Sequence, residues 1–178
     1  MYINKKGVDK DMIGKIKERE AIHESGHVVV AFYNKSEDFK LIQVEIVDKF
    51  NRGGFVRYDL SAYRSYNKED NYKEGKCLDI AFVKAFIATC YGGSLAEEVL
   101  LGNSKYLASG KDRRLAKQII KKYNKENPDQ KLDKKIIKTI KKETLVFLEK
   151  YKQDILNITE ALKKSKILTL KEIDKIIK

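Results

Sequence analysis

The chain has two histidines, four residues apart, with a glutamate directly after the first. On an α-helix, positions i and i+4 lie on the same face, so His23 and His27 can reach one metal ion together. Glu24 lies about 100° further round such a helix, beside the metal-facing side. In zinc hydrolases with this H-E-x-x-H pattern, zinc lowers the pKa of a water and the glutamate takes its proton as general base. The spacing therefore predicts a zinc site, Zn²⁺ being held by His23 and His27 with Glu24 as the base.

A three-ligand catalytic zinc site needs one more side chain, and the chain has no third histidine. Its two cysteines form no CxxC pair, so we expect a carboxylate. Asp112 in "SGKDRRLAK" and the Glu97-Glu98 pair in "GGSLAEE" both fit. Asp112 has a structural explanation too, because Ser109 and Asp112 form a capping pattern at the start of a helix. Spacing alone leaves the choice between Asp112 and the glutamates open.

The elements that must position these residues are mostly helical. One proline and 10 glycines favour long helices over a turn-rich β fold. Apolar spacing predicts helices at about 15–33, 78–91, 94–101 and 109–123, and one long amphipathic helix with apolar residues from Leu132 to Ile155. Gly92 and Gly93 are expected to separate the second helix from the third. Thr169 and Glu172 form a capping-box pattern for a last short helix.

A short β segment follows the histidine helix. Ile42, Val44 and Ile46 alternate with polar residues, and "NRGG" then precedes "FVRY", which predicts two strands that turn at 51–54. No linker divides the chain. We therefore expect one domain over residues 1–178, with a mainly α fold: a helical array with a small two-stranded β ribbon and a zincin-like HExxH helix.

Composition excludes several classes of function. Hydrophobic residues make up 42% and charged residues 36%, which is a soluble globular composition, and no apolar run is long enough to cross a bilayer. No signal peptide is apparent, so a cytoplasmic location is expected. The net charge of +12 comes mostly from Lys spread along the chain. No nucleic-acid-binding motif accompanies it, so nucleic acid is not expected as the main partner.

Three segments in order, "AIHESGHVVVA", "CYGGSLAEEVLLG" and "SGKDRRLAKQI", resemble the peptidase domain of the FtsH family of ATP-dependent zinc metalloproteases. The resemblance extends over nearly the whole chain, to the "LTLKEIDKII" ending. It implies that Asp112 is the third zinc ligand and that Glu97 is a nearby carboxylate that orients the ligands. It also implies that an extended substrate pairs with a strand edge beside the zinc, here Gly53, Gly54, Phe55 and Val56.

The chain departs from the family pattern in ways that bear on function. Ser25 replaces an alanine, Ser94 an arginine, and Lys111 an asparagine before the ligand Asp. No G-x-x-x-x-G-K-[ST] ATPase motif is present, so we expect either an excised domain or a stand-alone relative. Such a domain would cut unfolded protein or peptides, or work with a separate ATPase. Assembly as a homo-oligomer is compatible with this interpretation.

Two other hypotheses remain open from the sequence. An ImmA-like regulatory metallopeptidase also uses HExxH, although it accounts less well for "GGSLAEE" and "SGKD". A non-catalytic metal-binding or adaptor module would act by binding through its basic surface. The presence of Glu24 favours an enzyme, because a degenerate relative would most easily lose the base.

Overall fold

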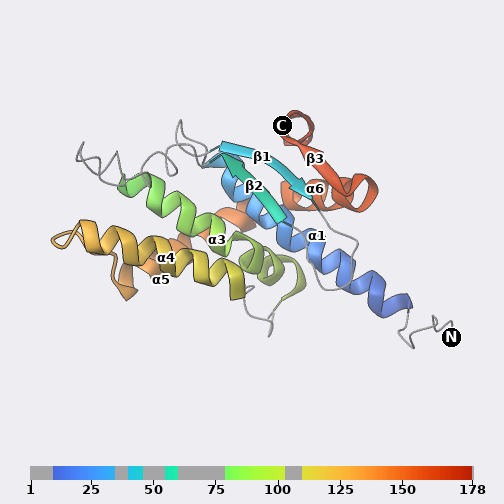
Figure 1. The fold of residues 1–178 in the computed structure, drawn as a ribbon. Helices are drawn as coiled ribbons and strands as arrows, with labels where there is room; N and C mark the ends of the chain where they lie inside the picture. Colours follow the sequence, from blue (N-terminus) through green and yellow to red (C-terminus); the bar gives the residue numbers. More distant parts are fainter. Residues whose placement is uncertain (1–9, 35–39, 46–54, 60–78, 103–109, 178) are drawn as a thin grey trace.

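The computed structural model describes residues 10–34, 40–45, 55–59, 79–102 and 110–177, and its fold is mainly α (Figure 1). This confirms the predicted fold class. The elements in chain order are α1 (Lys10–Tyr33), β1 (Lys40–Glu45), β2 (Phe55–Asp59), α3 (Ile80–Leu101), α4 (Gly110–Glu126), α5 (Lys134–Lys150), α6 (Lys152–Ser165), β3 (Ile167–Thr169) and α7 (Leu170–Ile176). Among these described residues, no helix combines the length and the apolar character that a bilayer crossing requires.

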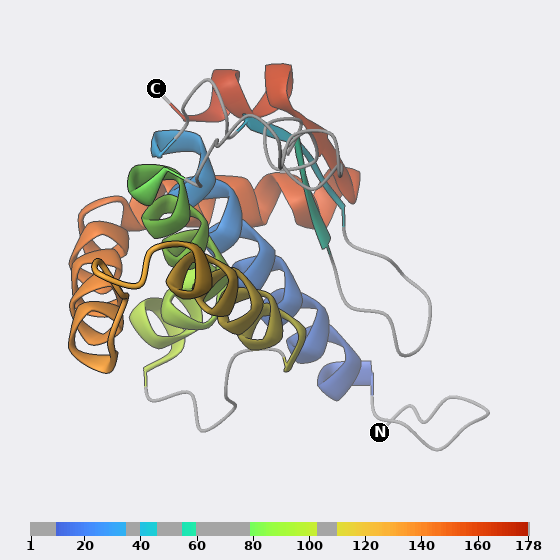
Figure 2. The same ribbon diagram turned by 60° about the vertical axis from the view of Figure 1, so that its left-hand side comes forward.

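Helices α1 and α3 form the centre of the molecule. Helices α4 and α5 pack against α3, whereas α6 and the sheet pack against α1 (Figures 1 and 2). The histidine helix is therefore covered on several sides, and the run from Val28 to Ala31 is fully buried. This explains why "VVVA" lacks the polar face that an exposed helix would need.

The two central helices approach each other closely through glycine. A Cβ atom at Gly26 would lie 2.4 Å from the carbonyl oxygen of Gly92 and 2.5 Å from the Cβ of Ala96. Any larger residue at Gly26 would push α1 away from α3. The predicted interruption at Gly92 and Gly93 is wrong, because α3 runs through both as one helix. These glycines serve helix packing, which offsets their low helix propensity.

The predicted long amphipathic helix is also wrong, because it divides at Tyr151 into α5 and α6. Tyr151 has φ −101° and ψ 27°, outside the helical range, and its ring lies 4.1 Å from that of Tyr33. The division lets α5 cover α3 while α6 covers α1. Apolar spacing continued across the junction because both helices bury one face in the same core.

The sheet has three strands in the order β2-β1-β3, all antiparallel. The ribbon of β1 and β2 agrees with the prediction, and Val44 is buried opposite Val56. The additional strand β3 was not predicted, because its three residues are too few to show a period of two. The capping box of Thr169 and Glu172 is present and starts α7. The predicted turn at 51–54 lies outside the described residues.

Replacement of Gly26 by alanine should destabilise the fold by about 3 kcal/mol, since overpacking at a rigid backbone contact forces two helices apart. Gly110→Ala is the matched control, because a Cβ there meets nothing within 4 Å and alanine favours a helix. Urea unfolding of the two variants beside the wild type measures the difference. Equal unfolding free energies for both variants would contradict the packing argument.

Candidate functional site

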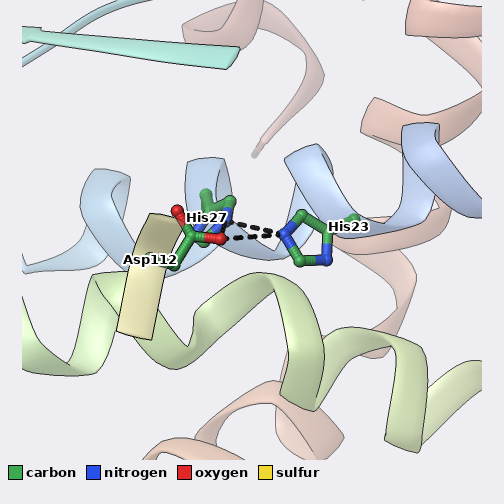
Figure 3. Close-up of side chains that lie close together, drawn as sticks. All are labelled: His23, His27 and Asp112. Carbon is green, nitrogen blue, oxygen red and sulfur yellow. Dashed lines mark hydrogen bonds and ion pairs between the residues drawn. The ribbon is translucent and has the colours of Figure 1, made fainter. Parts of the chain in front are cut away.

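Three side chains from two helices converge on one point (Figure 3). His23 and His27 project from α1, and Asp112 reaches them from the first turn of α4. Their nearest atoms form a triangle: Nε2 of His23 to Nε2 of His27 at 3.1 Å, Nε2 of His23 to Oδ2 of Asp112 at 3.3 Å, and Nε2 of His27 to the same oxygen at 3.5 Å.

The size of this triangle fits a zinc ion. Ligand atoms at about 2.0 to 2.2 Å from a tetrahedral centre lie about 3.3 to 3.6 Å from one another. Two of the three observed separations fall within or at the edge of that range, and the third is shorter by only about 0.2 Å. Two imidazole nitrogens and one carboxylate oxygen are also a donor set typical of catalytic zinc. The residues present therefore suit this metal in number, chemistry and spacing.

The Nδ1 atom of each imidazole contacts an oxygen atom of α3. The Nδ1 of His27 donates a hydrogen bond to the carbonyl oxygen of Thr89 at 2.6 Å, and the Nδ1 of His23 lies 2.6 Å from Oε1 of Glu97. Since a carbonyl or carboxylate oxygen can only accept, both Nδ1 atoms carry a proton. In the neutral rings, the Nε2 atoms that face Asp112 are then free to bind a metal.

Gly93 provides the space that the two rings occupy. A Cβ atom at this position would lie 2.6 Å from Nε2 of His23 and 2.7 Å from Nε2 of His27. A side chain there would therefore displace the two atoms on which the metal site depends. Gly92 spaces the helices, whereas Gly93 lies directly beside the donor atoms.

Glu24 is buried, with 6% of its surface exposed. Burial raises the pKa of its carboxyl, and the neighbouring His27 and His23 partly oppose this rise. A carboxyl whose pKa is raised toward neutral is a better proton acceptor and donor at physiological pH than an ordinary one. Glu24 directly follows His23 on α1, about 100° further round the helix.

The structure separates the two carboxylates between which spacing could not choose. Asp112 faces the Nε2 atoms of both histidines, whereas Glu97 contacts only the Nδ1 side of His23. Glu98 is exposed on the surface of α3. Of the residues expected to bind substrate, Gly53 and Gly54 lie outside the described residues. Phe55 and Val56 begin β2, and the Val56 side chain packs against the core.

Three contributors to the site were not predicted: Arg19, Thr89 and Gly93. Arg19 contacts Glu97, and its position one helical turn before His23 is a signal that could have identified it. Thr89 contributes a backbone carbonyl, which no side-chain pattern reveals. Ser25 also has an unpredicted role, since its buried hydroxyl accepts a hydrogen bond from Thr159 of α6.

No family model matches the chain, and no curated protein is significantly similar to it. The resemblance to the FtsH family therefore depends on the three motif segments alone.

The metal-free protein should lose stability as the pH rises toward 9. Burial lowers the pKa of His23, but its hydrogen bonds with Asp112 and Glu97, together with the negative charges of Glu24 and Glu97, outweigh this and raise the pKa from 6.5 to about 9. Because the folded pKa exceeds the unfolded one, the contribution of the imidazolium is complete below about pH 6.5 and is lost as the pH passes through about 9.

Urea unfolding in EDTA, at pH 6 and pH 9.5, compares the wild type with His23→Gln. The advantage of the wild type should shrink between these pH values by on the order of 2 to 3 kcal/mol. An advantage that is independent of pH would contradict the assignment of a protonated His23 to the metal-free form.

Proposed function

We propose that this chain is a zinc-dependent metalloendopeptidase of the FtsH peptidase type. The observation that carries the proposal is the triangle of His23, His27 and Asp112, whose edges suit a tetrahedral zinc ion. Glu24, which is buried and directly follows His23, has the raised pKa expected of a general base. These features combine a metal-binding set with a proton acceptor, which peptide hydrolysis needs and a purely structural metal site does not.

Charge balance supports a divalent ion at this position. Three largely buried carboxylates, those of Glu24, Glu97 and Asp112, lie around the histidines, and Arg19 pairs with one of them. Buried negative charge of this density is costly unless cations compensate it. A dication held by the two histidines and Asp112 would contribute to this compensation.

In the proposed mechanism, Asp112 and the two imidazoles would hold the metal. Zinc, when bound, supplies Lewis acidity that lowers the pKa of a water molecule and polarises the scissile carbonyl. Glu24 takes the proton of the attacking water and passes it to the nitrogen of the departing amine, so that one peptide bond is cleaved by one water. Thr89 and Glu97 keep the imidazole rings oriented through their Nδ1 protons.

The sheet offers a place for an extended substrate. Strand β2 lies at one edge of the described sheet, with β1 on its other side, and it packs against the histidine helix α1. A polypeptide that pairs with this edge would lie alongside the helix that carries Glu24. Because only an extended chain can pair in this way, we propose unfolded protein or peptides as substrates, delivered by a separate ATPase where the target is folded.

A second candidate function is a binding module with a basic surface. Helices α4 and α5 are both strongly basic: α4 has seven Lys and Arg residues against Asp112 and Glu126, and α5 has six Lys residues against Glu143 and Glu149. Such a surface attracts polyanions without any need for the buried Glu24. The zinc triangle and the base favour the enzyme, and the variant of Glu24 described below separates the two functions.

Replacement of Asp112 by alanine should remove most of the bound zinc. Elemental analysis of purified protein should give about one zinc per chain for the wild type and much less for Asp112→Ala, since two imidazoles alone bind zinc weakly. Glu98→Ala is the control, because Glu98 is an exposed carboxylate of α3. Equal zinc in all three proteins would exclude Asp112 as a ligand, and no zinc in the wild type after zinc is supplied would exclude the metallopeptidase.

Replacement of Glu24 by glutamine should abolish cleavage while zinc stays bound. The amide keeps the shape of the side chain but cannot accept the proton, so the rate constant for hydrolysis of an unfolded protein such as casein should fall at least about a hundredfold. Zinc content of the same sample is the control. Cleavage at the wild-type rate would exclude the proposed base, and polyanion binding without cleavage by zinc-loaded wild type would favour the binding module.

A further inference from the structure

Arg19 is the only arginine of α1, and it lies one helical turn before His23. Its guanidinium contacts Glu97 through two nitrogens, Nε at 2.5 Å and Nη2, and both reach the same oxygen, Oε2. The Arg19 side chain is 30% exposed, whereas that of Glu97 is 6% exposed. The arginine therefore brings a positive charge from the surface to a buried carboxylate.

The two oxygens of Glu97 have different partners. Oε2 is occupied by Arg19, which leaves Oε1 for the Nδ1 of His23 at 2.6 Å. A carboxylate that is bonded on one side only can rotate about its terminal torsion, because this torsion has broad minima. The two guanidinium contacts hold Oε2 in place and thereby limit rotation of the carboxylate. The position of Oε1 then sets the direction in which the imidazole N–H must point.

His27 needs no such support. Its Nδ1 donates to the backbone carbonyl of Thr89, an atom that α3 itself holds in place. His23 depends instead on the side chain of Glu97, which is in turn held by the side chain of Arg19. Neither side chain is fixed by the helix backbone. Of the two histidines, His23 is consequently the one whose orientation a surface substitution can disturb.

We propose that Arg19 is a positioning residue of the metal site, acting through Glu97 to hold the His23 ring with its Nε2 toward the metal. This inference rests on the proposed function, since it assigns Arg19 a role toward the metal that the triangle would bind. A residue at the periphery of the site would then control the affinity of the metal without touching it.

The sign of the effect distinguishes positioning from simple electrostatics. Removal of a positive charge close to a dication should strengthen metal binding if charge alone mattered. Loss of the orienting contact should weaken it, by about tenfold to a hundredfold. A merely structural role would lower the unfolding free energy while leaving the affinity of the folded protein unchanged.

The test measures zinc affinity of folded protein by competition with a chromophoric chelator, for the wild type, Arg19→Met, Arg19→Lys and Arg113→Met. Arg113→Met is the matched control. Arg113 is a half-buried arginine that follows Asp112 in the sequence, and its replacement removes the same charge. We expect the dissociation constant to rise at least about tenfold in Arg19→Met, to rise less in Arg19→Lys, and to stay unchanged or fall in Arg113→Met. The visible spectrum of the cobalt-substituted proteins should change in Arg19→Met alone.

Circular dichroism establishes that each variant is folded under the conditions of the titration. If Arg19→Met does not fold, Arg19→Ala takes its place, because alanine also removes both donors to Oε2 and has the highest helix propensity. Zinc affinity equal to or tighter than that of the wild type in the folded Arg19 variant would overturn the positioning role. Absence of zinc binding in the wild type would instead overturn the proposed function, so the two failures are distinguishable.

Discussion

Backbone contact between α1 and α3 is the constraint on which the rest of the site depends. Gly26 faces Gly92 and Ala96 at distances that leave no space for a further carbon atom. This contact brings the Thr89 carbonyl and the Glu97 carboxylate of α3 within 2.6 Å of the two imidazoles. If α3 lay even 1 Å further from α1, both hydrogen bonds would lengthen beyond an effective distance, because such bonds weaken steeply with separation. Helix packing and ligand orientation are therefore one feature of the molecule.

The same close approach buries two carboxylates of the site. Glu24 and Glu97 are 6% and 5% exposed, and a carboxylate so far from water needs a partner or loses its charge. Glu97 has Arg19 and His23 as partners. Glu24 has no such ion pair among the described residues, and burial raises its pKa accordingly. The two buried carboxylates thus acquire different properties: Glu97 is suited to orient the His23 ring, and Glu24 is suited to exchange a proton.

The sequence could predict the parts of this site that depend on local periodicity. His23, Glu24 and His27 are placed by the helix alone, and the capping box at Thr169 is local as well. The roles of Gly92 and Gly93 could not be predicted, because low helix propensity is visible in one segment while the packing that compensates it involves another. The division at Tyr151 was missed for a similar reason, since α5 and α6 continue one apolar pattern but cover different helices. Residue spacing could not tell whether Asp112 or Glu97 is the third ligand. Their positions in the structure differ, because Asp112 approaches Nε2 of His23 and Glu97 approaches Nδ1.

The third residue of the triangle lies far from the two histidines in the sequence, and this links metal binding to folding. Asp112 lies 89 residues from His23, and α4 packs against α3, so the carboxylate reaches the histidines of α1 only when three helices are assembled. An unfolded chain still offers the His23 and His27 pair, but its third donor is distant and closing so long a loop costs conformational entropy. A metal that uses all three donors binds the folded state more tightly than the unfolded one, and this difference in affinity adds to the free energy of unfolding. Metal bound by His23, His27 and Asp112 would therefore couple the stability of the helical array to the loading of its site.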